Sequence, residues 1–94
     1  MTSTKVRGKN RGHKVFIYTL STCGWCKRTK QFLSDSEVEY EYIDVDKCTP
    51  EERRAAIQNL HEKKAPLGFP VIIIDGERII SGFKPEEIKE ALDL

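Results

Sequence analysis

The chain has 94 residues and a formal net charge of +1, with 38% hydrophobic and 33% charged residues. This length suits a single domain with one modest core, and the composition is typical of a soluble globular protein. No apolar run approaches the roughly 20 residues of a membrane span, which excludes a membrane-spanning helix. The amino terminus lacks the apolar stretch of a signal peptide, so we expect a cytoplasmic protein.

The first 13 residues are basic, and we predict that they form a disordered, solvated tail before a domain over residues 14–94. Residues 1–14 contain five basic and no acidic side chains, whereas residues 15–94 contain eleven basic and fifteen acidic ones, a net charge of −4. Such a tail also allows weak contact with nucleic acid or with acidic partners. Because the tail has no aromatic side chain to stack on bases, nucleic acid is not an expected partner.

The first half of the domain reads as strand, helix and strand. Val15–Leu20 is a run of β-branched, aromatic and aliphatic residues, which predicts a buried strand. A helix is expected over Cys26–Ser36, with Phe32 and Leu33 facing inward. Tyr40–Val45 is again rich in aromatic and β-branched residues and predicts a second strand.

A capping box begins the next predicted helix. Thr49 precedes a proline, and Glu52 follows three residues after Thr49, so each of these two side chains can bond the backbone amide of the other residue. The helix should run to about Lys63. Three apolar residues at helical spacing are expected on its buried face: Ala56, Ile57 and Leu60.

The second half reads as a hairpin followed by a helix. After a loop over Ala65–Pro70, Val71–Ile74 predicts a third strand. The Asp75-Gly76 pair is a strong hairpin signal, so Arg78–Ser81 should be the antiparallel partner.

A last helix is expected from Pro85, which gives the element order β-α-β-α-β-β-α. Its apolar face carries Ile88, Ala91 and Leu92. The helix between the first two strands indicates a parallel pair with a right-handed crossover. We therefore predict an α/β fold, with a mixed four-stranded sheet and helices on both faces.

The segment Cys23-Gly24-Trp25-Cys26 lies where the first strand ends and the first helix begins. Three helical residues rise about 4.5 Å and turn about 300°, which places the two α-carbons about 5 Å apart. This separation falls inside the roughly 4.4–6.8 Å range of disulfides. The spacing therefore predicts a disulfide that closes and opens without a large backbone movement.

The start of a helix also favours the reactive form of Cys23. Its first turn offers unbonded amides and the positive end of the helix dipole, and both stabilise a thiolate. Lys27 and Arg28 follow and add positive charge. Cys26 lies one turn further in and should be more buried. We therefore expect Cys23 to attack a substrate disulfide and Cys26 to attack Cys23 in turn, with no metal or cofactor needed.

Other interpretations of the cysteines stay open. The pair can be half of a four-ligand zinc site, completed from Cys48, His13 and His61, although no second paired motif is present. The pair can also be two inert core thiols. Its place between a strand and a helix favours the redox role. For Cys48 we expect a free, partly exposed thiol, with a regulatory or dimer-forming role as the alternative.

The cysteine pair, the order of elements and the Phe69-Pro70-Val71 segment together resemble the glutaredoxin family over about residues 14–93. The resemblance implies a thioredoxin-like fold and a dithiol–disulfide oxidoreductase. It also implies that Pro70 is cis and faces the cysteine pair, leaving nearby backbone groups free to pair with a substrate chain. Phe69, Pro70 and Val71 are therefore expected to bind substrate, with a plain loop-to-strand junction as the alternative.

Three further positions bear on the substrate and the electron donor. Trp25 stands where many glutaredoxins have tyrosine, which implies an exposed side chain that contacts substrate; a partly buried packing role is the alternative. Leu20 stands where glutathione-using members typically have lysine. Residues 81–85 replace their Gly-Gly pair and acidic helix cap. The last two departures put glutathione binding in doubt.

The segment Ser-Gly-Phe-Lys-Pro at residues 81–85 is similar to the Ser-Gly-Phe-Arg-Pro signature of NrdH-redoxins, although Gly-Trp is not their usual pair between the cysteines. Those glutaredoxin-like proteins take electrons from thioredoxin reductase and serve ribonucleotide reductase. Gly82 and Phe83 become substrate-binding candidates, with a strand end and a hydrophobic staple as their plain interpretation.

The resemblance thus implies a monomer that reduces protein disulfides. Its reductant would be a thioredoxin reductase or a low-molecular-weight thiol, and the sequence identifies neither the donor nor the target. The alternative function is an iron–sulfur or metal carrier that uses the cysteine pair.

Overall fold

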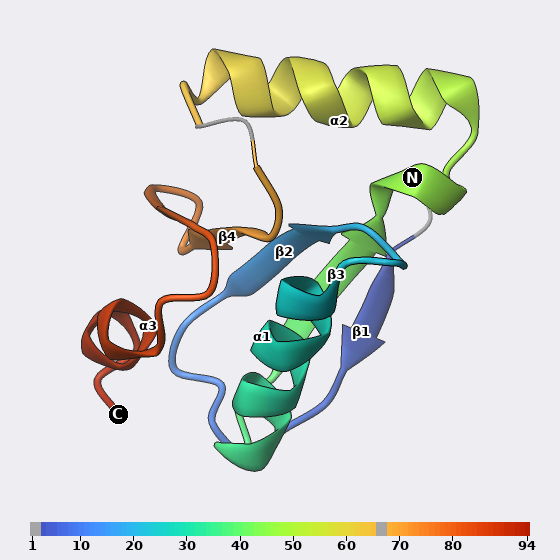
Figure 1. Cartoon of the computed structure of the whole chain (residues 1–94). Helices are drawn as coiled ribbons and strands as arrows, with labels where there is room; N and C mark the ends of the chain where they lie inside the picture. The colour runs from blue at the N-terminus through green and yellow to red at the C-terminus, as the bar shows by residue number, and fades with distance from the viewer. Residues whose placement is uncertain (1–2, 66–67) are drawn as a thin grey trace.

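The computed structural model describes residues 3–65 and 68–94, so the first two residues of the predicted tail and residues 66–67 of the predicted loop lie outside it. The elements follow the predicted order, with one strand added at the amino end (Figure 1). They are β1 (Thr4–Val6), β2 (Val15–Thr19), α1 (Gly24–Asp35), β3 (Tyr40–Asp44), the 3₁₀-helix η1 (Val45–Lys47), α2 (Pro50–Glu62), β4 (Val71–Ile74), β5 (Arg78–Ser81) and α3 (Pro85–Ala91).

The strands form one mixed sheet in the order β1-β3-β2-β4-β5. β2 and β3 are parallel and are joined by α1, whereas β4 is antiparallel to both β2 and β5. The α/β class and the mixed sheet are therefore confirmed, with five strands in place of the predicted four. The carboxyl ends of β2 and β3 lie together, which is where parallel α/β sheets place their functional residues.

The prediction of a disordered tail is wrong for residues 3–13. β1 pairs antiparallel with β3, with Val6 opposite Tyr40. Further on, the amide of Asn10 donates to the carbonyl of Glu37 at 2.9 Å, and the Asn10 carbonyl accepts from Glu39 at 3.0 Å. The outer edge of β3 would otherwise leave backbone groups unpaired, and the basic segment satisfies them. Such pairing needs no apolar pattern, so a charged segment gave no sign of it.

The helices lie on both faces of the sheet, as predicted. α1 and α3 pack on one face with the alternate strand residues that include Ile17 and Ile72, while α2 packs on the other face against Tyr18 and Ile73. In Figure 1, α1 lies in front of the sheet and α2 crosses above it. The apolar stripes of helices and strands thus close two small cores.

One predicted core residue is exposed. Ala56 and Leu60 are buried under α2, but the side chain of Ile57 is 47% exposed. Residues four apart in a helix point the same way, whereas the next residue is turned by about 100°. Because a single helix covers this face of the sheet, Ile57 lies at the margin of the contact instead of inside it.

The local signals at the helix ends are confirmed, with a shift in α1. The capping box of α2 is formed, since the Glu52 amide donates to the Thr49 hydroxyl at 3.2 Å. α1 begins at Gly24, two residues earlier than predicted, because Cys23 serves as its N-cap.

Candidate active site

Cys23 and Cys26 lie in the turn that connects β2 to α1. The Cys23 amide donates to the Leu20 carbonyl at 3.1 Å, which closes the turn. The Cys26 amide, one of the unbonded donors of the first helical turn, donates to Cys23 Sγ at 3.2 Å. The sulfur therefore takes the place of the oxygen that usually caps a helix, and this donor stabilises negative charge on it.

The two thiols differ in exposure and in acidity. Cys23 is partly exposed, whereas Cys26 is only 1% exposed. Burial, reinforced by the hydrogen bond with Cys23, raises the pKa of Cys26 to about 12. Cys26 is therefore protonated at neutral pH. The geometry thus supports the predicted order, in which Cys23 attacks first and Cys26 attacks second.

The predicted cis bond is present between Phe69 and Pro70. The Phe69 carbonyl oxygen lies 4.0 Å from Cys23 Sγ, so this loop borders the reactive sulfur. Pro70 is buried, and its carbonyl accepts from the Gly82 amide at 2.8 Å. The Val71 side chain is also buried, in the core under α2, which leaves only its backbone for any contact with a substrate.

Trp25 and Phe83, far apart in the sequence, meet beside the cysteine turn. Trp25 is 58% exposed and stacks on the Phe83 ring, with centroids 6.0 Å apart and planes inclined by 25°. Phe83 also meets the Phe32 ring edge-on at 6.0 Å. Gly82 has a φ of +86°, a backbone conformation that favours glycine and directs the chain from β5 toward this cluster. Trp25 is therefore exposed, as predicted, while one face of its ring packs on Phe83, and its contact with substrate stays a prediction.

The two basic residues after the cysteines, Lys27 and Arg28, were predicted to stabilise the Cys23 thiolate by their charge, and this stays a prediction. The Arg28 guanidinium lies 5.3 Å from the Trp25 ring, in a cation–π contact. Lys27 is exposed. Within the described residues neither side chain forms a hydrogen bond or ion pair with Cys23, so their predicted effect on the thiolate would act through space.

Sequence reasoning missed a polar group behind Cys26. The Lys30 ammonium lies 3.3 Å from a carboxylate oxygen of Asp44, and the Thr19 hydroxyl donates to the same oxygen at 2.6 Å. Thr19 is fully buried and lies opposite Asp44 in the parallel pair of strands. Lys30 follows Cys26 by one helical turn, and this i, i+4 spacing was the signal that could have revealed it.

An apolar cavity of about 390 Å³ opens beside the Phe69 loop. Leu20, Ile57 and Phe69 are among the side chains that line it. Arg53 lies at the cavity but donates to the carbonyls of Val45 and Asp46, at 3.1 and 3.2 Å. Leu20 thus presents an apolar wall at the position where glutathione-using relatives were expected to carry a lysine.

The zinc candidates do not gather at the cysteine pair. His13 directs one ring nitrogen to Asp75 and the other to Asp93, at 2.7 and 3.0 Å. His61 is exposed near the end of α2. In the part of the chain that the structure describes, no three histidine, cysteine, aspartate or glutamate side chains are grouped to hold a metal ion. Cys48 is partly exposed, and its thiol donates to the Asp44 carbonyl at 3.4 Å.

Comparison with known proteins extends these observations. Residues 15–79 match the sequence model of the family described as Glutaredoxin. The structure resembles the glutaredoxin of Methanosarcina mazei Go1, with a TM-score of 0.88 and 38% identity over 98% of this chain and 88% of that one. It also resembles the methanoredoxin of Methanosarcina acetivorans, with a TM-score of 0.86 and 40% identity over 93% and 90% of the two chains.

A third neighbour is the glutaredoxin-like NrdH-redoxin of Escherichia coli, with a TM-score of 0.64 and 30% identity over 82% of this chain and 92% of that one. Among the helices of residues 3–65 and 68–94, none has the length and apolar character needed to cross a membrane.

Proposed function

Because the chain belongs to the glutaredoxin family of thiol–disulfide oxidoreductases and has their thioredoxin-like fold, we propose that Cys23 and Cys26 reduce disulfides of proteins. The observation that carries the proposal is the unequal pair of thiols. One sulfur is accessible and accepts a helix amide, and the other is buried and protonated.

In the proposed cycle the Cys23 thiolate attacks a substrate disulfide, forms a mixed disulfide and releases one substrate thiol. Cys26 then attacks Cys23 and releases the second thiol, leaving a disulfide between the two cysteines. In this cycle the Phe69 carbonyl, 4.0 Å from Cys23 Sγ, and the exposed Trp25 side chain contact the substrate chain. A reductant afterwards returns the pair to thiols.

For the electron donor we propose a thioredoxin reductase in preference to glutathione. The cavity beside the Phe69 loop is lined mainly by apolar side chains, among them Leu20. Its cation, Arg53, already donates to two backbone carbonyls, which leaves less to offer the carboxylates of glutathione. The NrdH-redoxin of Escherichia coli, a similar structure, is described as having a thioredoxin-like activity profile. We extend the proposal to a cytoplasmic monomer that supplies electrons to ribonucleotide reductase.

Substitution of each cysteine tests the proposed cycle. Cys23→Ser should abolish reduction of a protein disulfide such as that of insulin, because no nucleophile begins the reaction. Cys26→Ser should accumulate a mixed disulfide between Cys23 and the substrate, visible by mass spectrometry. The same experiment on Cys48→Ser should give nearly unchanged turnover. Full activity of the Cys23→Ser protein would overturn the proposal.

The donor is tested by offering each reductant alone. NADPH with a thioredoxin reductase should sustain turnover, and glutathione with its own reductase should sustain much less. The reverse result would contradict the donor proposal while leaving the roles of the cysteines intact. Iron found in anaerobically purified protein, with visible colour, would instead support the alternative of an iron–sulfur carrier.

A further inference from the structure

Lys30 lies one helical turn after the buried Cys26 on α1, and its side chain is held in one place. Its ammonium lies 3.3 Å from Asp44 Oδ1 and 3.8 Å from the centroid of the Tyr42 ring. The side chains of Lys30 and Asp44 are each only 21% exposed. Asp44 is in turn fixed by the Thr19 hydroxyl at 2.6 Å. A lysine ordinarily leaves its ammonium mobile in water, so this degree of restraint on its long side chain is unusual.

The position of this ammonium relative to Cys26 follows from the helix. Side chains four residues apart lie on the same face of a helix, with β-carbons about 5–6 Å apart. Among the described residues, the titratable groups that act on Cys26 are Cys23 and Lys30, both on α1, and the groups that hold Lys30 are Asp44 and Tyr42 on β3. Of these, Lys30 favours the ionised form of Cys26 and lowers its pKa, whereas burial and Cys23 raise it.

The positive charge of Lys30 bears on the second step of the proposed cycle. In the second step the Cys26 sulfur must carry negative charge while it attacks Cys23, yet burial keeps it protonated. A fixed positive charge near a buried sulfur lowers the energy of its anion, and the effect is larger in a protein than in water.

We propose that Lys30, held by Asp44 and Tyr42, stabilises the Cys26 thiolate during the second, resolving step and has little effect on the first. This inference rests on the proposed function and adds a positioning residue to it. In the resolving step a bond forms between Cys26 Sγ and Cys23 Sγ, and the bond between Cys23 Sγ and the substrate sulfur breaks. Cys26 is oxidised, the substrate sulfur is reduced, and the Cys26 proton passes through water to the departing thiolate.

A two-step colour assay separates the two attacks. Reduced protein is mixed with one equivalent of dithiodipyridine, an uncharged aromatic disulfide. Cys23 releases one coloured thiopyridone when it attacks, and Cys26 releases the second when it resolves the mixed disulfide. All proteins compared carry Cys48→Ser, so that the third thiol does not react. Stopped-flow absorbance then gives a rate constant for each step.

Lys30→Met should slow the second release by about threefold to tenfold and leave the first within about twofold. The estimate follows from one charge near the sulfur and from partial loss of nucleophilicity as a thiol becomes more acidic. The rising pH profile of the second step should move to higher pH. Lys30→Arg, which keeps the charge, should restore most of the rate. Lys89→Met, at an exposed lysine of α3, is the matched control and should change neither step.

Three results would contradict the proposed role of Lys30. An unchanged second step in Lys30→Met would overturn the inference, and so would equal slowing of both steps or failure of Lys30→Arg to recover. Melting curves followed by circular dichroism identify a variant that is merely unfolded, in which case Lys30→Gln replaces Lys30→Met. If the reference protein releases no second thiopyridone, the proposed function itself fails, and that result is distinct from failure of the Lys30 inference.

Discussion

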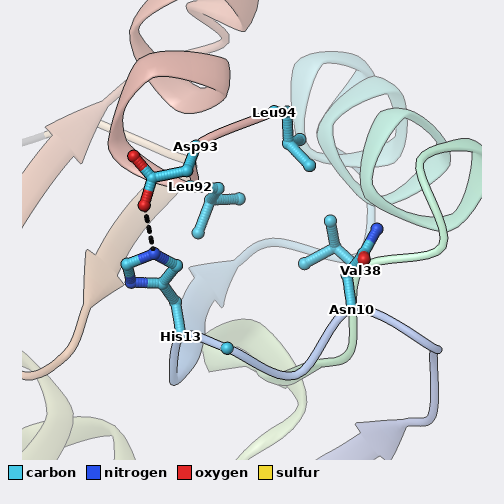
Figure 2. Close-up of a pocket in the computed structure, with 7 residues that line it drawn as sticks. Asn10, His13, Val38, Leu92, Asp93 and Leu94 are labelled. Carbon is cyan, nitrogen blue, oxygen red and sulfur yellow. Dashed lines mark hydrogen bonds and ion pairs between the residues drawn. The ribbon is translucent and has the colours of Figure 1, made fainter.

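Each end of β2 leads to a group of ionisable side chains, but the contacts that hold the two groups differ in sequence range. Its carboxyl end leads into Cys23 and Cys26, where the key bonds join residues three apart in the chain. Its amino end follows His13, whose imidazole bridges Asp75 of the β4–β5 turn and Asp93 near the carboxyl terminus. Figure 2 shows the His13 ring pointing toward Asp93, beside a cavity bordered by Val38 and Leu92.

The comparison shows how exposure to solvent changes the charge state that an ionisable side chain adopts. At the carboxyl end a thiol is buried, and the low polarity around Cys26 keeps it neutral. At the amino end the imidazole lies near the surface between two carboxylates, and the pKa of His13 is raised, first by Asp75 and then by Asp93. Both ring nitrogens can donate only when the ring is protonated, so this contact favours the cation.

The largest expected effect concerns the reactivity of the buried Cys26 thiol. In a Cys23→Ser, Cys48→Ser protein, Cys26 should react with iodoacetamide at pH 8 at least about tenfold more slowly than in urea. Burial, the largest cause of the raised pKa of Cys26, remains when Cys23 is replaced, so the folded protein has fewer thiolates than the unfolded one, and burial adds steric protection. Mass spectrometry measures the rate. Equal rates in the folded and unfolded protein would show that burial does not suppress this thiolate.

The second prediction, of intermediate size, concerns the stability of the amino-terminal segment before His13. A Cβ at Gly8 would lie 2.5 Å from the Glu37 carbonyl oxygen and 2.8 Å from the Glu39 amide nitrogen. Gly8→Ala should therefore lower the free energy of unfolding by about 1–3 kcal/mol, as overpacking does. Gly12→Ala is the control, because nothing lies within 4 Å of its Cβ. Urea unfolding measures both, and equal stability of the two variants would contradict the close approach.

The smallest effect tests the His13 contact through pH. Because the pKa of His13 is raised above 6.5, its stabilising contribution is complete below about pH 6.5 and is lost as pH rises through the raised value. Because His13 lowers the pKa of Asp75 below 3.8, that contribution is present above about pH 3.8 and is lost as pH falls through the lowered value. Stability from this contact should therefore be greatest between these limits.

His13→Gln should remove this pH dependence, whereas His61→Gln, at an exposed histidine of α2, should keep it. Urea unfolding at about pH 5.5 and 8.5 is the measurement. A wild-type protein whose stability does not fall between these two values, relative to His13→Gln, would count against a charged imidazole.

Sequence patterns predicted the elements that depend on neighbours in the chain. The capping box at Thr49 and the turn at Asp75 and Gly76 were read correctly, because their signals span only a few residues. Ile57 was misplaced because its helical spacing does not reveal how narrow the covering helix is relative to the sheet. β1 was missed because an edge strand is held by backbone pairing, for which a basic segment carries no apolar pattern.

By itself, the sequence determined the redox turn. A cysteine at the start of a helix, with a second one turn later, is defined by local geometry and needs no distant contact. Only the tertiary structure decided what surrounds the pair: the Phe69 carbonyl, the stacked Trp25 and Phe83, and the Lys30 ammonium held by Asp44. These groups come from α1, from β3 and from the loops before β4 and after β5, and the packing of the sheet brings them together. In the proposed cycle, the choice of the attacking sulfur is therefore a local property, whereas the proposed control of the resolving sulfur depends on the fold.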